Sequence, residues 1–405
     1  MAVRLLLTSN GPGEVASWVR PVVEAWRRAA PEEGVAVALL PCPYASGLEA
    51  AAIAGWPAPP PAASPRQTIR WLATSKAPPG LELAARGVVL HLGGDQLWSV
   101  ALAARLGWPA AVYTETTGRW PSRVSAYLCA DEAAARRVRA GGALPGAIQV
   151  VGNLMVDAVA AGGVRQDDGA LVGLLPGSKP FKVEWVTPLF LAVASLVRQA
   201  CPQVEFVLPL APTVPLPLLA AAAADAERAA VTGGLTARLM ERGGQPWLVT
   251  DDGTAVRVAP APDARRACRD LSVALTLPGT NTAELAVLGV PMVVALPLHR
   301  PEVIPVEGLA GRVAALPLVG PWLKRRMAAA LLAAPPLVAL PNARLGRLVT
   351  PEVVGDFPPH RLAATVVELL RDPPRRTAIS QALSAAMGEP GAAARVVEAL
   401  ATLAR

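Results

Sequence analysis

The feature that most constrains this chain is a repeated order of short apolar runs, turns rich in glycine and proline, and alanine-rich helical segments. The run VRLLLTS leads through the turn NGPGE into VASWVRPVVEAWRRA, and LVGLLPGSK leads into VEWVTPLFLAVASLVRQA. The apolar runs are nearly continuous rather than alternating, which is typical of strands buried on both faces. The pattern therefore predicts an α/β protein whose parallel sheets are covered by helices on both sides.

This order occurs in two series, and the length of 405 residues also favours two domains. The segment AVAAGGVRQDDGA between the series has glycines, paired aspartates and no periodicity, which marks a linker near residues 158–170. We predict one α/β domain over residues 1–160 and a second over residues 171–360, each an open, doubly wound parallel sheet. Residues 361–405 are expected to form helices that brace the two domains.

The composition limits the class of protein. Hydrophobic residues make up 53% of the chain and charged residues only 17%, which excludes disorder and leaves an enzyme with large cores or a protein at a membrane surface. Residues 207–224 carry no charge, but their four prolines argue against a transmembrane helix. The amino terminus lacks the pattern of a signal peptide, so we expect a cytoplasmic protein.

The four cysteines lie far apart and form no Cys-x-x-Cys pair, so the sequence indicates neither a zinc site nor a disulfide framework. No constellation of metal-ligating residues is visible in the sequence, and we expect neither a metal nor a cofactor.

The net charge of +7 is distributed unevenly. No acidic residue occurs between positions 307 and 352, and Trp322 and an apolar segment accompany the positive charges there. This stretch predicts either a patch for anionic lipid or phosphate, or a solvated helix face. Nucleic acid is disfavoured, because aromatic residues are only 4% and no known nucleic-acid module occurs. The positive residues of the stretch are Arg312, Lys324, Arg325, Arg326, Arg344 and Arg347.

Two turns of the second series combine Pro-Gly with hydroxyl side chains at the expected carboxyl end of a strand, where open α/β sheets bind ligands. In LPGTNTAE, Gly279 permits a sharp turn, and Thr280, Asn281 and Thr282 would begin a helix whose free N–H groups attract an anion such as a diphosphate. Glu284 could then accept hydrogen bonds from a ribose. The alternative is a capped helix whose glutamate complements the helix dipole.

In LLPGSK, Gly177 and Ser178 repeat this device, and Lys179 and Lys182 add cations that could neutralise phosphate oxygens or a leaving group. A structural turn followed by solvated lysines is the alternative.

A third candidate site combines two turns of the first series, NGPGE at residues 10–14 and GGDQ at residues 93–96. Gly11 and Gly13 would leave room for an acceptor beside Glu14 and Asp95. One carboxylate, with Asp95 favoured, could act as general base on an acceptor hydroxyl. Both carboxylates could instead cap helices. His91 and His299 also fall near expected strand ends, although a lone histidine is more often structural.

Taken together, these motifs resemble the lipid-A-disaccharide synthases. VGLLPGSKPFKVEW resembles their LLPGSR segment, LPGTNTAELAVLGVPMVV their SGTATLE segment, and VVGNLMVDA their GHPxxD-like segment. PLVALPNARLGRLVTPEVV resembles their VSLPNxLxGxxxxPE stretch. The four matches occur in order and cover most of the chain, most strongly between residues 150 and 352.

The resemblance implies a GT-B fold, in which two Rossmann-like domains face each other across a cleft and the final helices return to the first domain. It implies an inverting, metal-independent transfer of an N-acetylglucosamine-type sugar from UDP to a membrane lipid. Ser178 and Lys179 would then face phosphate, residues 280–282 would hold the diphosphate, Glu284 would bind the ribose, and Asn342 would line the site. The partners implied are a UDP-sugar donor, a lipid acceptor and the anionic inner face of the cytoplasmic membrane, and a homodimer stays open.

The departures from the family concentrate in the first series. Its GExSGD segment becomes NGPGEVAS, its acidic DxPDFN-like loop is reduced to GGDQ, and lysine replaces the arginine of LLPGSR. These changes indicate a branch related to the synthases rather than a synthase itself. Two alternatives are a UDP-N-acetylglucosamine 2-epimerase, whose SGGxxEE segment is absent here, and a non-catalytic protein that binds nucleotide sugars.

Overall fold

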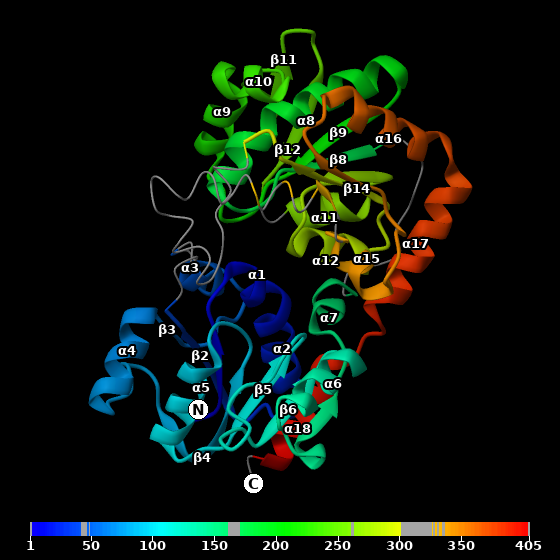
Figure 1. The fold of residues 1–405 in the computed structure, drawn as a ribbon. Coiled ribbons are helices and arrows are strands. Elements are labelled where there is room, and N and C mark those ends of the chain that lie inside the picture. Colours follow the sequence, from blue (N-terminus) through cyan, green and yellow to red (C-terminus); the bar gives the residue numbers. More distant parts are fainter. Residues whose placement is uncertain are drawn as a thin grey trace. The chain divides into compact units, whose positions relative to one another are not determined.

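The computed structural model describes residues 2–41, 47, 49–160, 171–260, 263–300, 326, 329, 332–333 and 337–403. The chain forms two compact units, drawn in Figure 1. Unit 1 comprises Met1–Ala161 and Gly388–Arg405, and unit 2 comprises Gly162–Met387. The helical tail is therefore divided between them. Helices α16 (Pro359–Arg371) and α17 (Pro373–Met387) belong to unit 2, and α18 (Ala392–Leu403) belongs to unit 1.

Unit 1 contains a seven-stranded sheet in which every neighbouring pair is parallel, in the order β3-β2-β1-β4-β5-β6-β7. Its strands are β1 (Val3–Ser9), β2 (Gly34–Leu39), β3 (Ala62–Ala63), β4 (Leu83–His91), β5 (Ala110–Thr114), β6 (Ala126–Cys129) and β7 (Ile148–Val150).

Both faces of this sheet are covered, which explains its continuous apolar strands. Along β1, Leu5 and Leu7 join a core with Trp26, whereas Leu6 joins a separate core with Trp71. Side chains alternate across a strand, so the uncharged run serves two cores at once. The covering helices are α2 (Arg20–Ala29), α7 (Leu154–Ala160) and α18 on one face, and α4 (Pro65–Thr74) and α5 (Gln96–Leu106) on the other.

The remaining helices of unit 1 are α1 (Pro12–Glu14), the π-helical turn η1 (Val15–Val19), α3 (Glu49–Ala54), α6 (Glu132–Ala140) and η2 (Pro145–Ala147).

The last helix, α18, is fastened to unit 1 by polar contacts as well as by its apolar face. The carboxylate of Asp157 accepts hydrogen bonds from the N–H groups of Gly391 and Ala393, each at 2.5 Å. Arg395 Nε donates to the carbonyl oxygen of Val151 at 2.7 Å. The carboxylate thus binds the positive end of a helix. The return of the carboxyl-terminal helix to the first helices is confirmed, since α18 packs on α2.

Unit 2 contains an eight-stranded sheet in the order β10-β11-β12-β9-β8-β13-β14-β15. Its strands are β8 (Leu171–Leu175), β9 (Glu205–Pro209), β10 (Ala237–Arg242), β11 (Gln245–Thr250), β12 (Ala255–Ala259), β13 (Val273–Thr276), β14 (Met292–Pro297) and β15 (Glu352–Gly355). Its further helices are α8 (Pro180–Ala200), α9 (Leu216–Ala223), α10 (Ala226–Thr232), α11 (Asp263–Arg269), α12 (Thr280–Val287) and α15 (Leu340–Leu345).

The strands from β12 to β15 pair in parallel, as expected, whereas β10 and β11 form an antiparallel hairpin at one edge. Gly243 and Gly244 at its tip both have positive φ, at 57° and 77°. Two residues of this conformation form the tight turn that suits the twist of paired strands.

Helix α8 is the one described helix that is long and apolar enough to cross a membrane by length and composition. Its 18-residue apolar window is 67% buried inside the protein, and the helix packs against α9, α10 and α16. It therefore forms part of the core of unit 2. Residues 207–224, which the prolines excluded as a membrane span, form the end of β9, a turn and all of α9.

Candidate functional site

The first candidate site lies at the carboxyl edge of the sheet in unit 2. Strands β8 and β13 are parallel neighbours, and their register pairs Leu175 with Thr276. The turns that follow these residues, LPGSK and LPGT, therefore lie side by side although a hundred residues separate them in the chain. Gly177 has φ of +100° and Gly279 has φ of +148°, conformations that side chains rarely adopt. Both Pro-Gly turns predicted from the sequence thus meet at one edge.

Lys182 connects the two turns. Its Nζ donates a hydrogen bond to the carbonyl oxygen of Pro278 at 3.0 Å. A Cβ atom on Gly177 would lie 3.3 Å from Lys182 Cδ, and one on Gly279 would lie 3.8 Å from Lys182 Nζ. The methylene groups of Lys182 therefore pass beside Gly177, and its ammonium group lies beside Gly279 and Pro278. Lys179, which the sequence analysis placed at a phosphate, is the N-cap residue of α8 and makes no side-chain cap there.

The three polar residues after Gly279 differ in what they face. Thr280 is exposed and Asn281 is half-buried at the start of α12, where no side chain caps the helix. Thr282 is buried, and its hydroxyl donates to the carbonyl oxygen of Gly279 at 2.8 Å and accepts from the N–H of Leu340 at 3.3 Å. Thr282 thus holds the turn in shape, and the contact of Thr280 and Asn281 with a diphosphate stays a prediction.

Glu284 is half-buried on α12. Burial, together with the charge of Glu284, raises the pKa of the Cys268 thiol to about 12. The carboxylate of Glu284 therefore lies close to that thiol, and the assignment of Glu284 to a ribose stays a prediction.

Asn342 supports the turn from behind. Its amide nitrogen donates to the carbonyl oxygen of Thr350 at 2.8 Å and to Glu352 Oε1 at 2.7 Å, and its oxygen accepts from the N–H groups of Val349 and Thr350 at 2.8 and 3.0 Å. The side chain is fully buried. These contacts use both donors and the oxygen of the amide. They fix the segment that reaches Thr282, so the structure shows a structural role, and direct contact with a nucleotide sugar stays a prediction.

The second candidate site lies at the carboxyl edge of the sheet in unit 1, where β1 and β4 are parallel neighbours. The turns NGPGE and GGDQ meet there. The carboxyl group of Glu14 lies against both glycines, because a Cβ atom on Gly11 would overlap it and one on Gly93 would lie 3.1 Å from its Cδ. Burial raises the pKa of Glu14, a hydrogen bond from the Gly11 N–H opposes this, and the nearby charge of Glu49 adds to it.

Asp95 has a different environment. It is exposed, and its Oδ1 accepts a hydrogen bond from the N–H of Leu97 at 3.0 Å as the N-cap of α5. Capping was the alternative to catalysis at this residue, and it is present in the structure. Glu14, with its raised pKa, is the carboxyl group at this edge that better suits a general base.

A buried chain of hydrogen bonds lies beneath this edge. His91 Nδ1 is 2.7 Å from Ser99 Oγ, which is 2.6 Å from Thr8 Oγ1. Burial lowers the pKa of His91 to about 4, although the charge of Asp95 opposes the shift. A neutral histidine here links β1, β4 and α5, so its role is structural.

The basic stretch predicted for lipid or phosphate falls mostly outside the described residues. Arg312, Trp322, Lys324 and Arg325 lie there, while Arg326 is described as a helical, exposed residue. Arg344, on α15, contacts the sulfur of Met387 on α17. Within the described part of the chain, no group of three or more His, Cys, Asp or Glu side chains is arranged to hold a metal ion.

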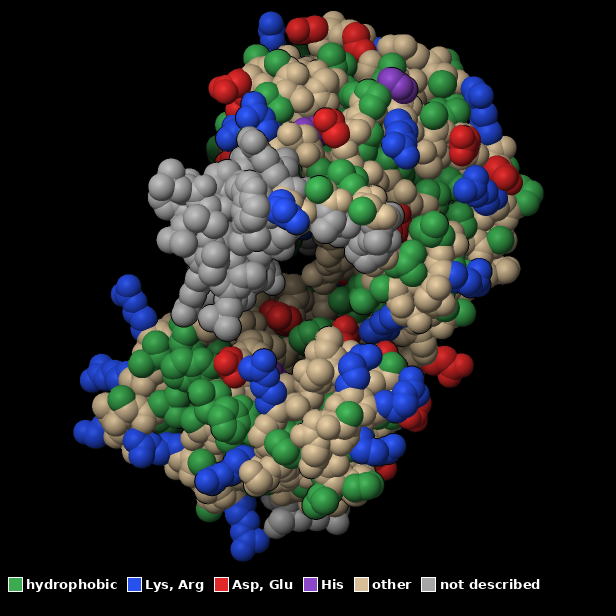
Figure 2. Space-filling view, viewed as in Figure 1, with side chains coloured by type: hydrophobic (Ala, Val, Ile, Leu, Met, Phe, Trp, Pro, Cys, Tyr) green, Lys and Arg blue, Asp and Glu red, His purple; other side chains and the backbone are tan. Residues whose placement is uncertain are grey.

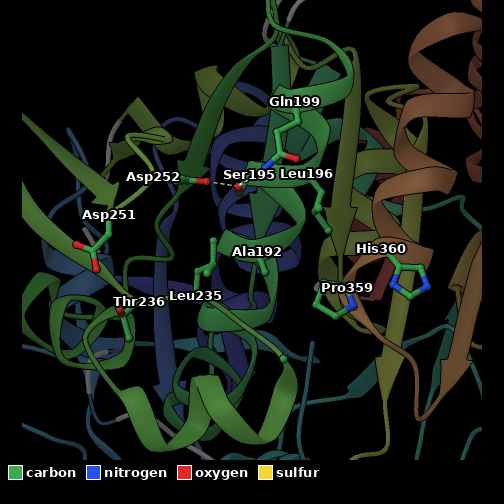
Figure 3. A pocket seen from close by; sticks show the side chains of 11 residues that line it. Ala192, Ser195, Leu196, Gln199, Leu235, Thr236, Asp251, Asp252, Pro359 and His360 are labelled. Atoms are coloured by element: carbon green, nitrogen blue, oxygen red, sulfur yellow. Dashed lines mark hydrogen bonds between the residues drawn. The ribbon is translucent and has the colours of Figure 1, made fainter.

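A separate cavity of about 470 Å³ lies in unit 2, between the second half of α8, the β11–β12 turn and the start of α16 (Figure 3). The carboxylate of Asp252 accepts hydrogen bonds from the hydroxyls of Ser195 and Thr250 and from the N–H of Thr254. Burial alone would raise the pKa of Asp252, but these bonds hold it well below its usual range. None of the residues predicted for the functional site lines this cavity.

Comparison with known proteins identifies relatives by sequence. No protein-family model matches the chain. Over 231 residues it is 33% identical to the lipid-A-disaccharide synthase of Anaeromyxobacter sp. (strain K). This match covers 56% of this chain and 48% of the relative. The synthase of Syntrophus aciditrophicus is 28% identical over 269 residues, covering 63% of this chain and 57% of the relative.

This chain is a distant homologue of the lipid-A-disaccharide synthases. The match to the Anaeromyxobacter synthase spans about half of that protein's length.

Solved structures show the fold. A putative UDP-N-acetylglucosamine 2-epimerase from Listeria monocytogenes superposes with a TM-score of 0.58 at 15% identity, covering 99% of this chain and 96% of that one. The S. aureus protein MnaA, solved with UDP, gives a TM-score of 0.55 at 13% identity, with 98% and 95% covered. The predicted GT-B-like fold, with its two α/β sheets, is confirmed.

Proposed function

We propose that this synthase homologue is an inverting glycosyltransferase that transfers an N-acetylglucosamine-type sugar from UDP to a lipid acceptor. The observation that carries the proposal is the position of Lys182 between two glycine turns at neighbouring strand ends in unit 2. A cation beside glycine turns and a helix amino terminus is the arrangement that binds a diphosphate. The homology to synthases supplies the reaction class, and the MnaA structure shows a protein of similar fold with UDP.

In this proposal unit 2 holds the donor. The amide groups at the start of α12 and the ammonium group of Lys182 would contact the diphosphate, with Thr280 and Asn281 beside it. These groups stabilise the diphosphate most strongly when its bond to the sugar breaks, because the leaving UDP then gains negative charge. Lys179 and Ser178 stay candidates for the outer phosphate, and Glu284 for the ribose.

Unit 1 would supply the base and hold the acceptor. Glu14 would take the proton of an acceptor hydroxyl, whose oxygen forms a bond to the anomeric carbon of the sugar. The bond between that carbon and the diphosphate oxygen breaks, and its electron pair leaves with UDP. A carboxyl group with a raised pKa accepts a proton more readily than an exposed one, so we place Glu14 before Asp95 as the base.

A lipid acceptor is supported by the surface of unit 1. Ile69 on α4 and Leu97 on α5 are large exposed hydrophobic residues, and Arg66 and Arg70 are exposed on the same helix as Ile69. Figure 2 shows hydrophobic side chains gathered over this part of the unit, with Lys and Arg side chains at its border. Apolar side chains ringed by cations suit an anionic membrane surface, and we propose that the protein acts there, on the cytoplasmic side.

The test uses the purified chain with UDP-N-acetylglucosamine. We expect calorimetry to show binding of UDP, and we expect UDP release when bacterial polar lipids are added, in the presence of EDTA as well as without it. Incubation of the nucleotide sugar alone, followed by NMR, separates transfer from epimerisation, since only an epimerase makes product without an acceptor. Binding without UDP release from any lipid extract would instead favour a non-catalytic binding protein, and absence of UDP binding would refute the proposal.

A further inference from the structure

A histidine and an aspartate are paired at the carboxyl edge of unit 2, beyond the two glycine turns. His299 follows β14 and Asp356 follows β15, and these strands are parallel neighbours. The N–H of Leu298 donates to the carbonyl oxygen of Gly355 at 2.8 Å, so the pairing of the two strands continues up to the dyad. His299 Nδ1 lies 2.5 Å from Asp356 Oδ1.

The surroundings fix the imidazole ring in place. The side chain of His299 is only 10% exposed, whereas that of Asp356 is 79% exposed. The ring packs edge-to-face on Phe357, with centroids 5.7 Å apart. An ionised carboxylate only accepts hydrogen bonds, so Nδ1 is protonated and its N–H donates a hydrogen bond to Asp356. The other ring nitrogen, Nε2, is therefore the atom that can form a hydrogen bond with a ligand.

Nε2 is buried, and no described residue forms a hydrogen bond with it. A buried polar atom without a partner is costly, and each one calls for an explanation, of which a water, an ion or a ligand group is one. The other two histidines of the chain differ in this respect. His91 forms a hydrogen bond with the hydroxyl of Ser99, and His360 is exposed.

The dyad lies next to the proposed diphosphate site. The strand order β8-β13-β14-β15 places β14 directly beside β13, at the usual spacing of about 4.8 Å between strands. The last pair in their register is Thr276 with Val294, and Gly279 follows Thr276 by three residues while His299 follows Val294 by five. Along this edge, the glycine turns with Lys182 and the start of α12 follow β8 and β13, and His299 follows the next strand, β14.

We propose that His299 is a further donor-binding residue that binds the nucleoside diphosphate as an imidazolium, with the second proton taken from solvent. Its Nε2–H then contacts a phosphoryl oxygen while Nδ1–H remains bonded to Asp356. Asp356 is then a positioning residue, which acts through the ring and does not touch the ligand. This inference rests on the proposed function, since it requires a nucleoside diphosphate at the glycine turns. It adds a third point of contact to the amides and to Lys182.

The experiment compares the binding of UDP and uridine to the full chain and to His299→Gln by calorimetry. We expect the variant to bind UDP about 10-fold more weakly, the effect of losing one charge-assisted hydrogen bond, and to bind uridine as the wild type does. Asp356→Asn should give a smaller loss with the same selectivity for UDP. His360→Gln is the matched control, because that histidine is exposed at the start of α16, and its UDP affinity should equal that of the wild type.

A second measurement needs no variant. With ¹⁵N-labelled histidine, addition of UDP to the wild type should shift the Nε2 resonance of His299 and leave that of His360 unchanged, and uridine should shift neither. A wild type that binds UDP while His299→Gln binds it equally well, with an unmoved His299 resonance, overturns this inference and leaves the proposed function intact. A wild type that does not bind UDP overturns both.

Discussion

The carboxyl edges of the two sheets are built alike and charged in opposite ways. In unit 2 strands β8 and β13 end in Pro-Gly turns, and Lys182 and the His299–Asp356 dyad follow the strands of the same edge. In unit 1 the strands end in glycines that border the carboxylates of Glu14 and Asp95. The same parallel architecture therefore presents the proposed anion site in one unit and a pair of carboxyl groups in the other. The fold places the sites, and the few residues after each strand decide their chemistry.

The largest effect should come from the acidic edge. Replacing Glu14 with Gln keeps the shape of the side chain but removes the base, so sugar transfer should fall by about 100-fold or more. Asp95→Asn should lower transfer far less, because its oxygen can still cap α5. UDP release from nucleotide sugar and lipid extract measures both. Equal losses in the two variants, or a larger one in Asp95→Asn, would move the base to Asp95, as the sequence favoured.

The stability of the Glu14→Gln variant gives a check on its folding. The pKa of Glu14 is raised in the folded protein above its ordinary value of 4.5, so the folded state holds this proton more tightly than the unfolded state. Its contribution to stability is therefore present below pH 4.5 and is lost as pH rises through the folded value. The variant lacks this loss, and its free energy of unfolding at neutral pH should be no lower than that of the wild type.

The next effect concerns the anion edge. Gly279 has φ of +148°, a backbone conformation that only glycine adopts without strain. In Gly279→Ala the turn must shift, and the start of α12 shifts with it, so UDP should bind about 100-fold more weakly, a change of roughly 3 kcal/mol. Gly253→Ala is the control. That glycine also has positive φ, at +80°, but has open space around it in the β11–β12 turn. It should share the cost in stability and keep UDP affinity, and unchanged affinity in Gly279→Ala would contradict an anion site there.

A third prediction tests the buried chain beneath the acidic edge. The pKa of His91 falls from 6.5 to about 4 on folding, so its contribution to stability is complete above pH 6.5 and is lost as pH falls toward 4. Between pH 7 and pH 4.5 this group should cost about 2 kcal/mol of the free energy of unfolding. Urea denaturation at the two pH values measures it, and His91→Gln should show a loss smaller by that amount. The same loss in both proteins would mean that His91 is not buried in its neutral form.

Much of the fold could be predicted from the sequence, because uncharged runs, Pro-Gly turns and alanine-rich helices are local signals. The two glycine turns of unit 2 were found in this way, and so were the two turns that meet at Glu14. The antiparallel β10–β11 hairpin was missed, although GlyGly between two polar strands is a usable signal for a tight turn.

The arrangement of the site could not be predicted in the same way, because it depends on strand order. Lys182 reaches Pro278 across 96 residues, and His299 reaches Asp356 across 57, in each case because neighbouring parallel strands bring their ends together. Strand order follows from packing and not from periodicity. The burial of Glu14 and the four hydrogen bonds of Asn342 likewise depend on contacts that a linear pattern does not contain. The roles assigned to Ser178, Lys179, Thr280, Asn281 and Glu284 stay predictions.

The smallest effect separates two lysines of one turn. The sequence placed Lys179 at the phosphate, whereas the structure places the ammonium group of Lys182 beside Gly279 and Pro278. Lys182→Met keeps most of the length of the side chain and removes its charge, so UDP should bind about 10-fold more weakly while uridine binding is unchanged.

Lys179→Met should weaken UDP binding by less than about 3-fold, since charges that are partly solvated contribute little. Lys76→Met, at an exposed position of unit 1, should leave UDP affinity unchanged and so corrects for the loss of net charge. The order of the two losses is decisive because both lysines lie at the start of the same helix, Lys179 as its N-cap and Lys182 in its first turn. If Lys179→Met proves the more damaging, the charge that meets the diphosphate comes from the N-cap of α8, and the contact between Lys182 and Pro278 serves only to join the turns.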